Sequence, residues 1–173
     1  MTIPSAILAL VTLLIPPSAV PGLDYTQLAS IAWGIEGEVT YHPGDYYGPQ
    51  SINAAYIAGC TIVNRASSPY FPSTPHAVVT QPHQFNPHKQ ITSVSRASVH
   101  IALDVYTYPD YHCNGELFVY SRADLASLNW LLRRYAAIST AETGNWGIYG
   151  FDRYPGDIPL SEIIASLDVG LEP

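Results

Sequence analysis

Apolar residues recur at helical spacing in several parts of the chain. The first such segment opens with Asp24, followed three positions later by Gln27, which is a capping-box pattern for a helix start. Its apolar positions fall on one helical face and are Leu28, Ile31, Ala32 and Ile35. Gly34 and Gly37 weaken the far end, so we expect this helix to stop near Glu36.

The same spacing predicts further helices along the chain. The middle of the next one, A-A-Y-I-A-G-C-T-I-V, is apolar almost all round, so we expect it to be the central buried helix. A later helix should turn Val99, Ala102, Leu103 and Tyr106 toward the core. In chain order the expected segments are 51–65, one turn at 76–81, 93–107, 122–137 and a last turn at 161–167.

Strand patterns are scarce. Residues 116–121, E-L-F-V-Y-S, have strand-like composition after a turn, and 144–157 indicate a Gly/aromatic loop or a short strand pair. No repeat or low-complexity linker interrupts the chain. The patterns predict one mainly α domain of the α+β kind, with long loops and room for one small β-hairpin.

The N-terminus is apolar and carries no ionised side chain as far as Leu23. The run 6–15 is too short to span a bilayer and has the length of the apolar centre of a secretory signal. A retained apolar arm is the alternative. We therefore divide the chain into 1–22, signal peptide or arm, and 23–173, the catalytic domain, and expect an exported protein without a stable membrane span.

Composition narrows the partners. With 173 residues, 47% of them apolar, the chain can bury one core, and we expect a monomer. The net charge of −7 and the shortage of Lys and Arg exclude a typical nucleic-acid binder. Many tyrosines, prolines and glycines instead favour sugar ligands, which stack on aromatic rings and hydrogen-bond to phenols and amides.

Cysteine and histidine chemistry adds little. Cys60 and Cys113 could pair in an exported chain, but Cys60 lies on an apolar helical face where a buried thiol is equally reasonable. None of the six histidines shows the spacing of a zinc site, so we expect no metal and no cofactor. Nor does the sequence contain a nucleophile elbow for Ser/His/Asp catalysis.

The segment S-I-A-W-G-I-E-G-E-V places Glu36 and Glu38 at the end of the first predicted helix. In an arbitrary sequence two such glutamates are usually surface charges. They gain significance from a loop further along the chain.

Residues 64–85 resemble the signature of the SleB-type cell wall hydrolases, the family of the spore cortex-lytic enzymes, which reads roughly N-R-x-x-S-P-x-F-P-x-T-x-x-x-V-V-x-Q-P-x-Q-F. The agreement needs no gap and comprises Asn64, Arg65, Ser68, Pro69, Phe71, Pro72, Thr74, Val78, Val79, Gln81, Pro82, Gln84 and Phe85. L-A-S-I-A-W-G, C-N-G-E-L-F-V-Y-S and G-N-W-G-I-Y-G resemble further elements of the family in the same order.

This resemblance implies a lysozyme-like fold of the goose-type or lytic transglycosylase sort. It also implies cleavage of the β-1,4 bond between N-acetylmuramic acid and N-acetylglucosamine in peptidoglycan. One glutamate can serve as acid and then as base if the muramic acid's C6 hydroxyl attacks, which is lytic transglycosylation. A catalytically silent peptidoglycan-binding or structural surface protein is the alternative, and an amidase or peptidase would ordinarily need a metal or Cys/His site.

The catalytic position departs from the family pattern. The family usually reads W-G-E-x-x-G-E, whereas this chain reads W-G-I-E-G-E, one residue shorter. Alignment on W-G places the family's first glutamate at Ile35, and alignment on the closing G-E places it at Gly34. Either Glu36 takes the acid position, which we favour, or only Glu38 survives as the catalytic carboxyl.

The resemblance also suggests substrate contacts. Gln84 would bind sugar hydroxyls and Phe85 would stack, although the same loop could simply anchor a buried Phe. Trp146 stands where the family tends to have His and could stack on a sugar, while Tyr120 and Tyr149 are either cleft wall or core tyrosines. Asn64 and Arg65 more plausibly tie the end of the central helix to the loop, with Arg65 a partner for Glu38.

Overall fold

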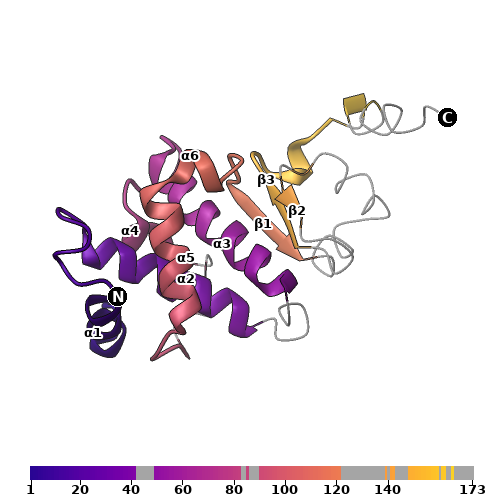
Figure 1. The fold of residues 1–173 in the computed structure, drawn as a ribbon. Helices are drawn as coiled ribbons and strands as arrows, with labels where there is room; N and C mark the ends of the chain where they lie inside the picture. The colour runs from indigo at the N-terminus through magenta and orange to yellow at the C-terminus, as the bar shows by residue number, and fades with distance from the viewer. Residues whose placement is uncertain are drawn as a thin grey trace.

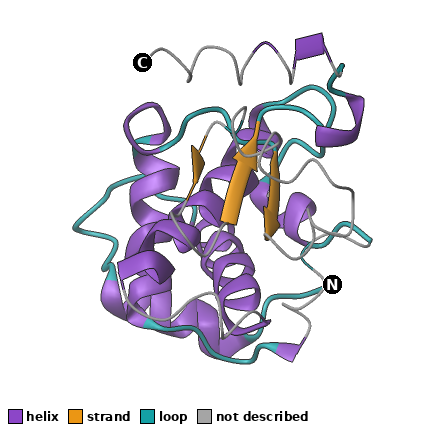
Figure 2. Cartoon of the chain, turned by 90° about the vertical axis from the view of Figure 1, so that its right-hand side faces the viewer, coloured by secondary structure: helices purple, strands orange, loops and turns teal. Residues whose placement is uncertain are grey.

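The computed structural model describes residues 1–41, 49–82, 85, 90–121, 139, 141–142, 148–159, 161–162 and 165. This part of the chain is mainly helical with one small antiparallel sheet, as predicted (Figures 1 and 2). Its helices are α1 (Ser5–Leu14), α2 (Tyr25–Tyr41), α3 (Pro49–Ser67), α4 (Pro75–Val79), α5 (Arg96–Thr107) and α6 (Pro109–His112). Its strands are β1 (Phe118–Ser121), β2 (Ala141–Glu142) and β3 (Ile148–Phe151), followed by a 3-10 turn η3 (Pro155–Asp157). The helix predicted at 122–137 lies outside the described residues.

The start of α2 follows the predicted cap. Asp24 Oδ1 accepts hydrogen bonds from the backbone N–H groups of Thr26, at 3.0 Å, and Gln27, at 3.1 Å. The Gln27 side chain does not complete the reciprocal box, because its Oε1 accepts the backbone N–H of His76 at 3.0 Å. The cap residue thus starts the helix, while Gln27 holds the start of α4 against it.

The predicted end of α2 near Glu36 is wrong, because the helix continues to Tyr41. Gly34 does not end it but allows a close approach: a Cβ there would lie 2.6 Å from Ile62 Cδ1 and 3.0 Å from Val79 Cγ2. Packing against α3 and α4 therefore outweighs the low helix propensity of glycine. As a result, Glu36 and Glu38 both project from continuous helix.

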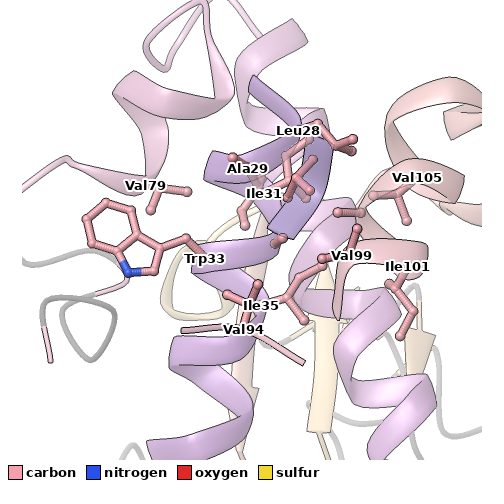
Figure 3. Packing of buried hydrophobic residues seen from close by; sticks show 14 of the residues in the cluster. Leu28, Ala29, Ile31, Trp33, Ile35, Val79, Val94, Val99, Ile101 and Val105 are labelled. Atoms are coloured by element: carbon pink, nitrogen blue, oxygen red, sulfur yellow. The ribbon is translucent and has the colours of Figure 1, made fainter. Parts of the chain in front are cut away.

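The core forms where α2, α3 and α5 meet, and α3 also contacts α4, α6 and the sheet, which confirms it as the central helix. Figure 3 shows side chains of α2 and α5 packed together in this core. The predicted α2 face is fully buried, and on α5 Val99 and Ala102 are buried while Leu103 and Tyr106 are partly buried.

The N-terminal segment packs onto this core. Ile7, Val11 and Ile15 are buried against it, and the Tyr25 hydroxyl donates a 2.8 Å hydrogen bond to the carbonyl of Ile15. Figure 1 shows α1 on the side of the molecule away from the sheet. Among the described helices, none has the length and hydropathy needed to cross a bilayer.

The sheet has strand order β1-β3-β2, and both strand pairs are antiparallel. Tyr120 of β1 lies opposite Tyr149 of β3, which in turn faces Glu142 of β2. The strand predicted at 116–121 is therefore confirmed over Phe118–Ser121. The two-residue β2 is too short to leave a pattern in the sequence.

A disulfide joins Cys60 of α3 to Cys113, which follows α6, with 5.3 Å between their Cα atoms. Of the two alternatives left open by the sequence, the structure has the pair. The bridge closes a loop with a sequence separation of 53 residues and fixes the approach to β1 against the central helix.

Candidate active site

Arg65 connects the sheet to residues 68–85, the part of the family signature that follows α3, which we call the motif loop. It lies near the C-terminal end of α3, is 5% exposed, and its Nε donates a 2.6 Å hydrogen bond to the Leu117 carbonyl. Its guanidinium carbon lies 4.8 Å from the ring centre of Phe71, 5.3 Å from that of Phe118 and 5.6 Å from that of Phe85. Three aromatic faces therefore enclose one buried cation.

The charge of this cation interacts with the carboxylate predicted to be its partner. Burial lowers the pKa of Arg65 to about 10, while the nearby Tyr120 and Glu38 groups act in the opposite direction. The guanidinium is still charged at neutral pH because that pKa lies well above 7. The structure thus brings Arg65 and Glu38 into electrostatic interaction.

Glu38 lines a cavity of about 340 Å³ beside Arg65. Its walls come from α2, the end of α3, the motif loop and β1, and its lining residues are Glu38, Arg65, Phe85, Phe118, Val119, Tyr120 and Tyr154. The cavity is of the size of small-ligand sites and combines aromatic walls with one acid and one base. Aromatic rings also lie beside the general-acid carboxyl in lysozyme, a sugar-cleaving enzyme.

Phe85 enters the cavity from an unusual backbone. Its φ is +40°, in the left-handed region that bulky residues rarely adopt, and its side chain is 7% exposed. Such strain is maintained only where the surroundings fix it, and it concentrates at functional sites. The predicted stacking residue therefore lies in the cavity wall, against the Arg65 guanidinium.

Glu36 has different surroundings. Its Oε2 accepts a 2.9 Å hydrogen bond from the backbone N–H of Ser95 and a 2.6 Å hydrogen bond from the Ser98 hydroxyl. Ser95 is the N-cap of α5, so the carboxylate lies at the positive end of that helix. The residues that line the cavity include Glu38 and not Glu36.

The two alternative positions of the family's first glutamate lie in the core. Ile35 is fully buried. At Gly34 even a Cβ meets Ile62 and Val79 at 3.0 Å or less. Neither position can therefore present a carboxyl to the cavity, whereas Glu38, on the same helix, does.

Of the other residues predicted to contact the substrate, one lines the cavity, one is buried outside its lining and two are not described. Tyr120 lines the cavity, while its cross-strand neighbour Tyr149 is 4% exposed and is not among the lining residues. Gln84 and Trp146 lie outside the described residues.

Asn64 ties the end of α3 to the chain before β1, a segment other than the loop expected from the sequence. Its Nδ2 donates to the Glu116 carbonyl at 3.0 Å and to Glu116 Oε2 at 3.3 Å. Glu116 is 1% exposed, and its carboxylate also accepts the Asn114 backbone N–H at 2.9 Å. This buried anion was not among the predicted residues.

Two aromatic wall residues were also missed. Phe118 lies two positions before Tyr120 on β1, so strand alternation could have placed both rings on one face. Tyr154 follows β3 and reaches Phe118 and Tyr120 with ring-centre distances of 5.9 Å and 6.4 Å. No local pattern marks Tyr154, because only the sheet brings it to β1.

One group of metal-ligating side chains occurs among the described residues: Cys60, Cys113 and Glu116, whose ligand atoms lie within 4.8 Å of one another. Both sulfur atoms are committed to the disulfide, so they offer no thiolate to a metal.

Comparison with known proteins supplies one match. A family model described as Cell Wall Hydrolase matches residues 50–146, which is more than half of the chain. The match covers the motif loop, α5, β1 and all of α3 except its first residue. No curated protein and no solved structure matches the chain.

Proposed function

Because the chain belongs to the cell wall hydrolase family, we propose that it cleaves the β-1,4 bond between N-acetylmuramic acid and N-acetylglucosamine in peptidoglycan, with Glu38 as the catalytic acid and base. Family membership supports a hydrolase that acts on peptidoglycan. The choice of bond and of carboxyl rests on one observation: Glu38 lines the aromatic cavity, whereas Glu36 binds the start of α5.

The first step requires a proton on Glu38. A sugar bound in the cavity displaces water and disfavours the charged carboxylate, so the acid form becomes accessible. Glu38 then gives its proton to the glycosidic oxygen as the bond from that oxygen to C1 breaks, and an oxocarbenium-like charge builds on the muramic acid ring. The carboxylate left behind lies beside the positive charge of Arg65, which stabilises it.

The second step uses that carboxylate as a base. It removes the proton from the C6 hydroxyl of the same muramic acid as this oxygen bonds to C1, which gives a 1,6-anhydro sugar and restores protonated Glu38. No water is consumed, and one carboxyl suffices. Among the residues that line the cavity in the described chain, Glu38 is the sole carboxylate, which supports lytic transglycosylation over a two-carboxylate hydrolysis.

The aromatic walls would bind the glycan. Phe85, Phe118 and Tyr120 present ring surface and one phenol to the cavity, and we assign them to sugar stacking and hydroxyl recognition. Gln84 adjoins Phe85 in the sequence and is assigned to sugar hydroxyls on the family signature. The substrate places the protein's activity outside the cytoplasmic membrane, at the cell wall.

Product analysis tests the reaction. Purified protein is incubated with a cell-wall suspension, and the soluble fragments are separated and weighed by mass spectrometry. We expect clearing of the suspension and muropeptides that end in anhydro-muramic acid, one water lighter than hydrolysis products. Reducing muramic acid ends would contradict transglycosylation but keep the glycosidase. Free peptide stems with intact glycan would contradict both.

The altered spacing in W-G-I-E-G-E favours one competing function, a peptidoglycan-binding protein without catalysis. It is motivated by Gly34 and Ile35, neither of which provides the family's first glutamate. Such a protein would sediment with insoluble peptidoglycan and release no muropeptides. Binding without release, unchanged by Glu38→Gln, would establish this alternative in place of the enzyme.

A further inference from the structure

A second cavity lies on another face of the central helix. It has a volume of about 250 Å³, and we name it the α3–α6 pocket after the helices that form it. Its lining residues are Asn53, Tyr56, Ile57, Cys60, Tyr111, His112, Asn114 and Glu116. The four from α3 follow the spacing of one helical stripe, and none of the eight lines the Glu38 cavity.

The pocket displays aromatic rings at its mouth. Tyr111 is 86% exposed, and its ring meets His112 edge-on with 4.9 Å between ring centres. On the other side His112 stacks on Tyr56 at 5.3 Å. An exposed ring supported by a second and a third is a surface on which a sugar ring can stack.

Amide side chains complete this chemistry. Asn53 and Asn114 are both exposed and line the same pocket, so each can offer a donor and an acceptor to a ligand. A combination of stacking surface and amides suits a ligand with hydroxyl and acetamido groups. The volume is below that of a pocket for a drug-sized ligand and suits one sugar residue.

The charge of the pocket selects among sugars. Among its eight lining residues Glu116 contributes a buried carboxylate and no Lys or Arg balances it. A nearby Asp104 accepts the Tyr56 hydroxyl at 2.6 Å and adds a second negative group. An anionic ligand would be repelled, which disfavours muramic acid with its lactyl carboxylate and favours an uncharged N-acetylhexosamine.

The pocket is also fixed in shape before any ligand binds. The disulfide joins α3 to the segment after α6, and Glu116 is held by Asn64 and Asn114. Tyr56 is oriented by its hydrogen bond to Asp104. A site that need not be ordered on binding loses less affinity to entropy.

From this geometry we propose that the α3–α6 pocket binds a single uncharged N-acetylhexosamine residue through Tyr111, Asn53 and Asn114. The identification of that sugar with the N-acetylglucosamine of the wall glycan rests on the proposed function. The pocket would then hold the polymer at a point separate from the bond that is cut.

The test uses full-length protein carrying Glu38→Gln, so that no glycan is cut, and the neutral probe tri-N-acetylchitotriose. Binding is followed by NMR, with the ring signals of Tyr111 and His112 reporting on the pocket and those of Phe118 and Tyr120 reporting on the Glu38 cavity. We expect saturable shifts at Tyr111 and His112. Shifts confined to Phe118 and Tyr120 would overturn the proposal.

Two variants make the test specific. Tyr111→Ala removes the stacking ring and should weaken binding, followed at the His112 signal, by about tenfold. Tyr70→Ala is the matched control, because Tyr70 is 87% exposed and does not line the pocket. Equal affinities of the two variants would overturn the assignment.

A charge comparison completes the design. N-acetylglucosamine should shift the His112 signal at lower concentration than N-acetylmuramic acid, and equal responses would contradict the role given to Glu116.

No readout depends on cleavage, so a protein that binds the probe here but never clears cell walls would retain this site while losing the proposed enzyme. A protein that clears cell walls but does not bind the probe at the α3–α6 pocket would keep the proposed enzyme and lose this site.

Discussion

Removal of the Glu36 carboxylate should lower the free energy of unfolding and leave the catalytic activity unchanged. Glu36 accepts two hydrogen bonds, from the Ser95 N–H at 2.9 Å and from the Ser98 hydroxyl at 2.6 Å. Both donors belong to the first turn of α5, and Ser98 is only 4% exposed. The variant Glu36→Ala deletes both bonds and the negative charge at that helix end.

The magnitude follows from these contacts. A hydrogen bond to a charged group contributes about 1.5–3 kcal/mol, but water can replace the carboxylate at the exposed Ser95, and the Ser98 hydroxyl retains a 3.1 Å contact with the Ser95 hydroxyl. The charge at the helix end adds about 0.3–1 kcal/mol. We expect a loss of about 2 kcal/mol for Glu36→Ala, and about 1 kcal/mol for Glu36→Gln, which keeps one acceptor.

Urea unfolding followed by circular dichroism measures this loss. For a chain of this size, 2 kcal/mol corresponds to a fall in melting temperature of about 4–8 °C. Specific activity on cell walls, measured below the melting temperature of each variant, should stay near that of the parent protein. A Glu36→Gln variant with parental stability but no activity would refute the structural role and make Glu36 the chemical group.

Three further predictions concern other parts of the fold. Gly34→Ala should lose about 1–3 kcal/mol in thermal unfolding, since its Cβ would lie 2.6 Å from Ile62 Cδ1, and an unchanged melting temperature would argue against the close helix approach. Val11→Ala should cost about 1–3 kcal/mol in urea unfolding if α1 stays packed on the core, where Val11 is fully buried, whereas a neutral result would indicate that α1 is not part of the folded unit. Burial, then the hydrogen bond to Asp104 and its charge, raise the pKa of Tyr56 from 10.0 to about 12. Because the pKa of Tyr56 is higher in the folded than in the unfolded protein, the stabilisation by its neutral phenol is complete below pH 10 and is lost as the pH rises to 12. Between pH 10 and 12, Tyr56→Phe should therefore lose about 1 kcal/mol less stability than the parent protein. Identical losses of stability in the variant and the parent, measured by urea unfolding at both pH values, would contradict the role of the Tyr56 hydroxyl.

The sequence predicts those features that local patterns encode. The Asp24 cap needs only its own neighbours, and the buried face of α2 follows from helical periodicity, so both are confirmed. The helix end was predicted wrongly because Gly34 serves packing against Ile62, a partner 28 positions away that no local rule can see.

The candidate site shows the same division. The family signature includes Arg65 at the end of α3 and Phe85 in the loop that follows, and both line the Glu38 cavity. From the sequence we favoured Glu36 as the acid, whereas we now propose Glu38, because Ser98 of α5 binds Glu36 and β1 borders the cavity that Glu38 lines. The lysozyme-like form of the fold stays a prediction of the resemblance, since no solved structure matches.

The most direct test of the central claim compares Glu38→Gln with Glu36→Gln in the release of anhydro-muropeptides from purified cell walls. Melting temperatures measured alongside show that each variant is folded. We predict that Glu38→Gln is folded and releases none, because the amide can neither give nor take the proton, while Glu36→Gln remains active with a lowered melting temperature. Undiminished release by folded Glu38→Gln would contradict the account.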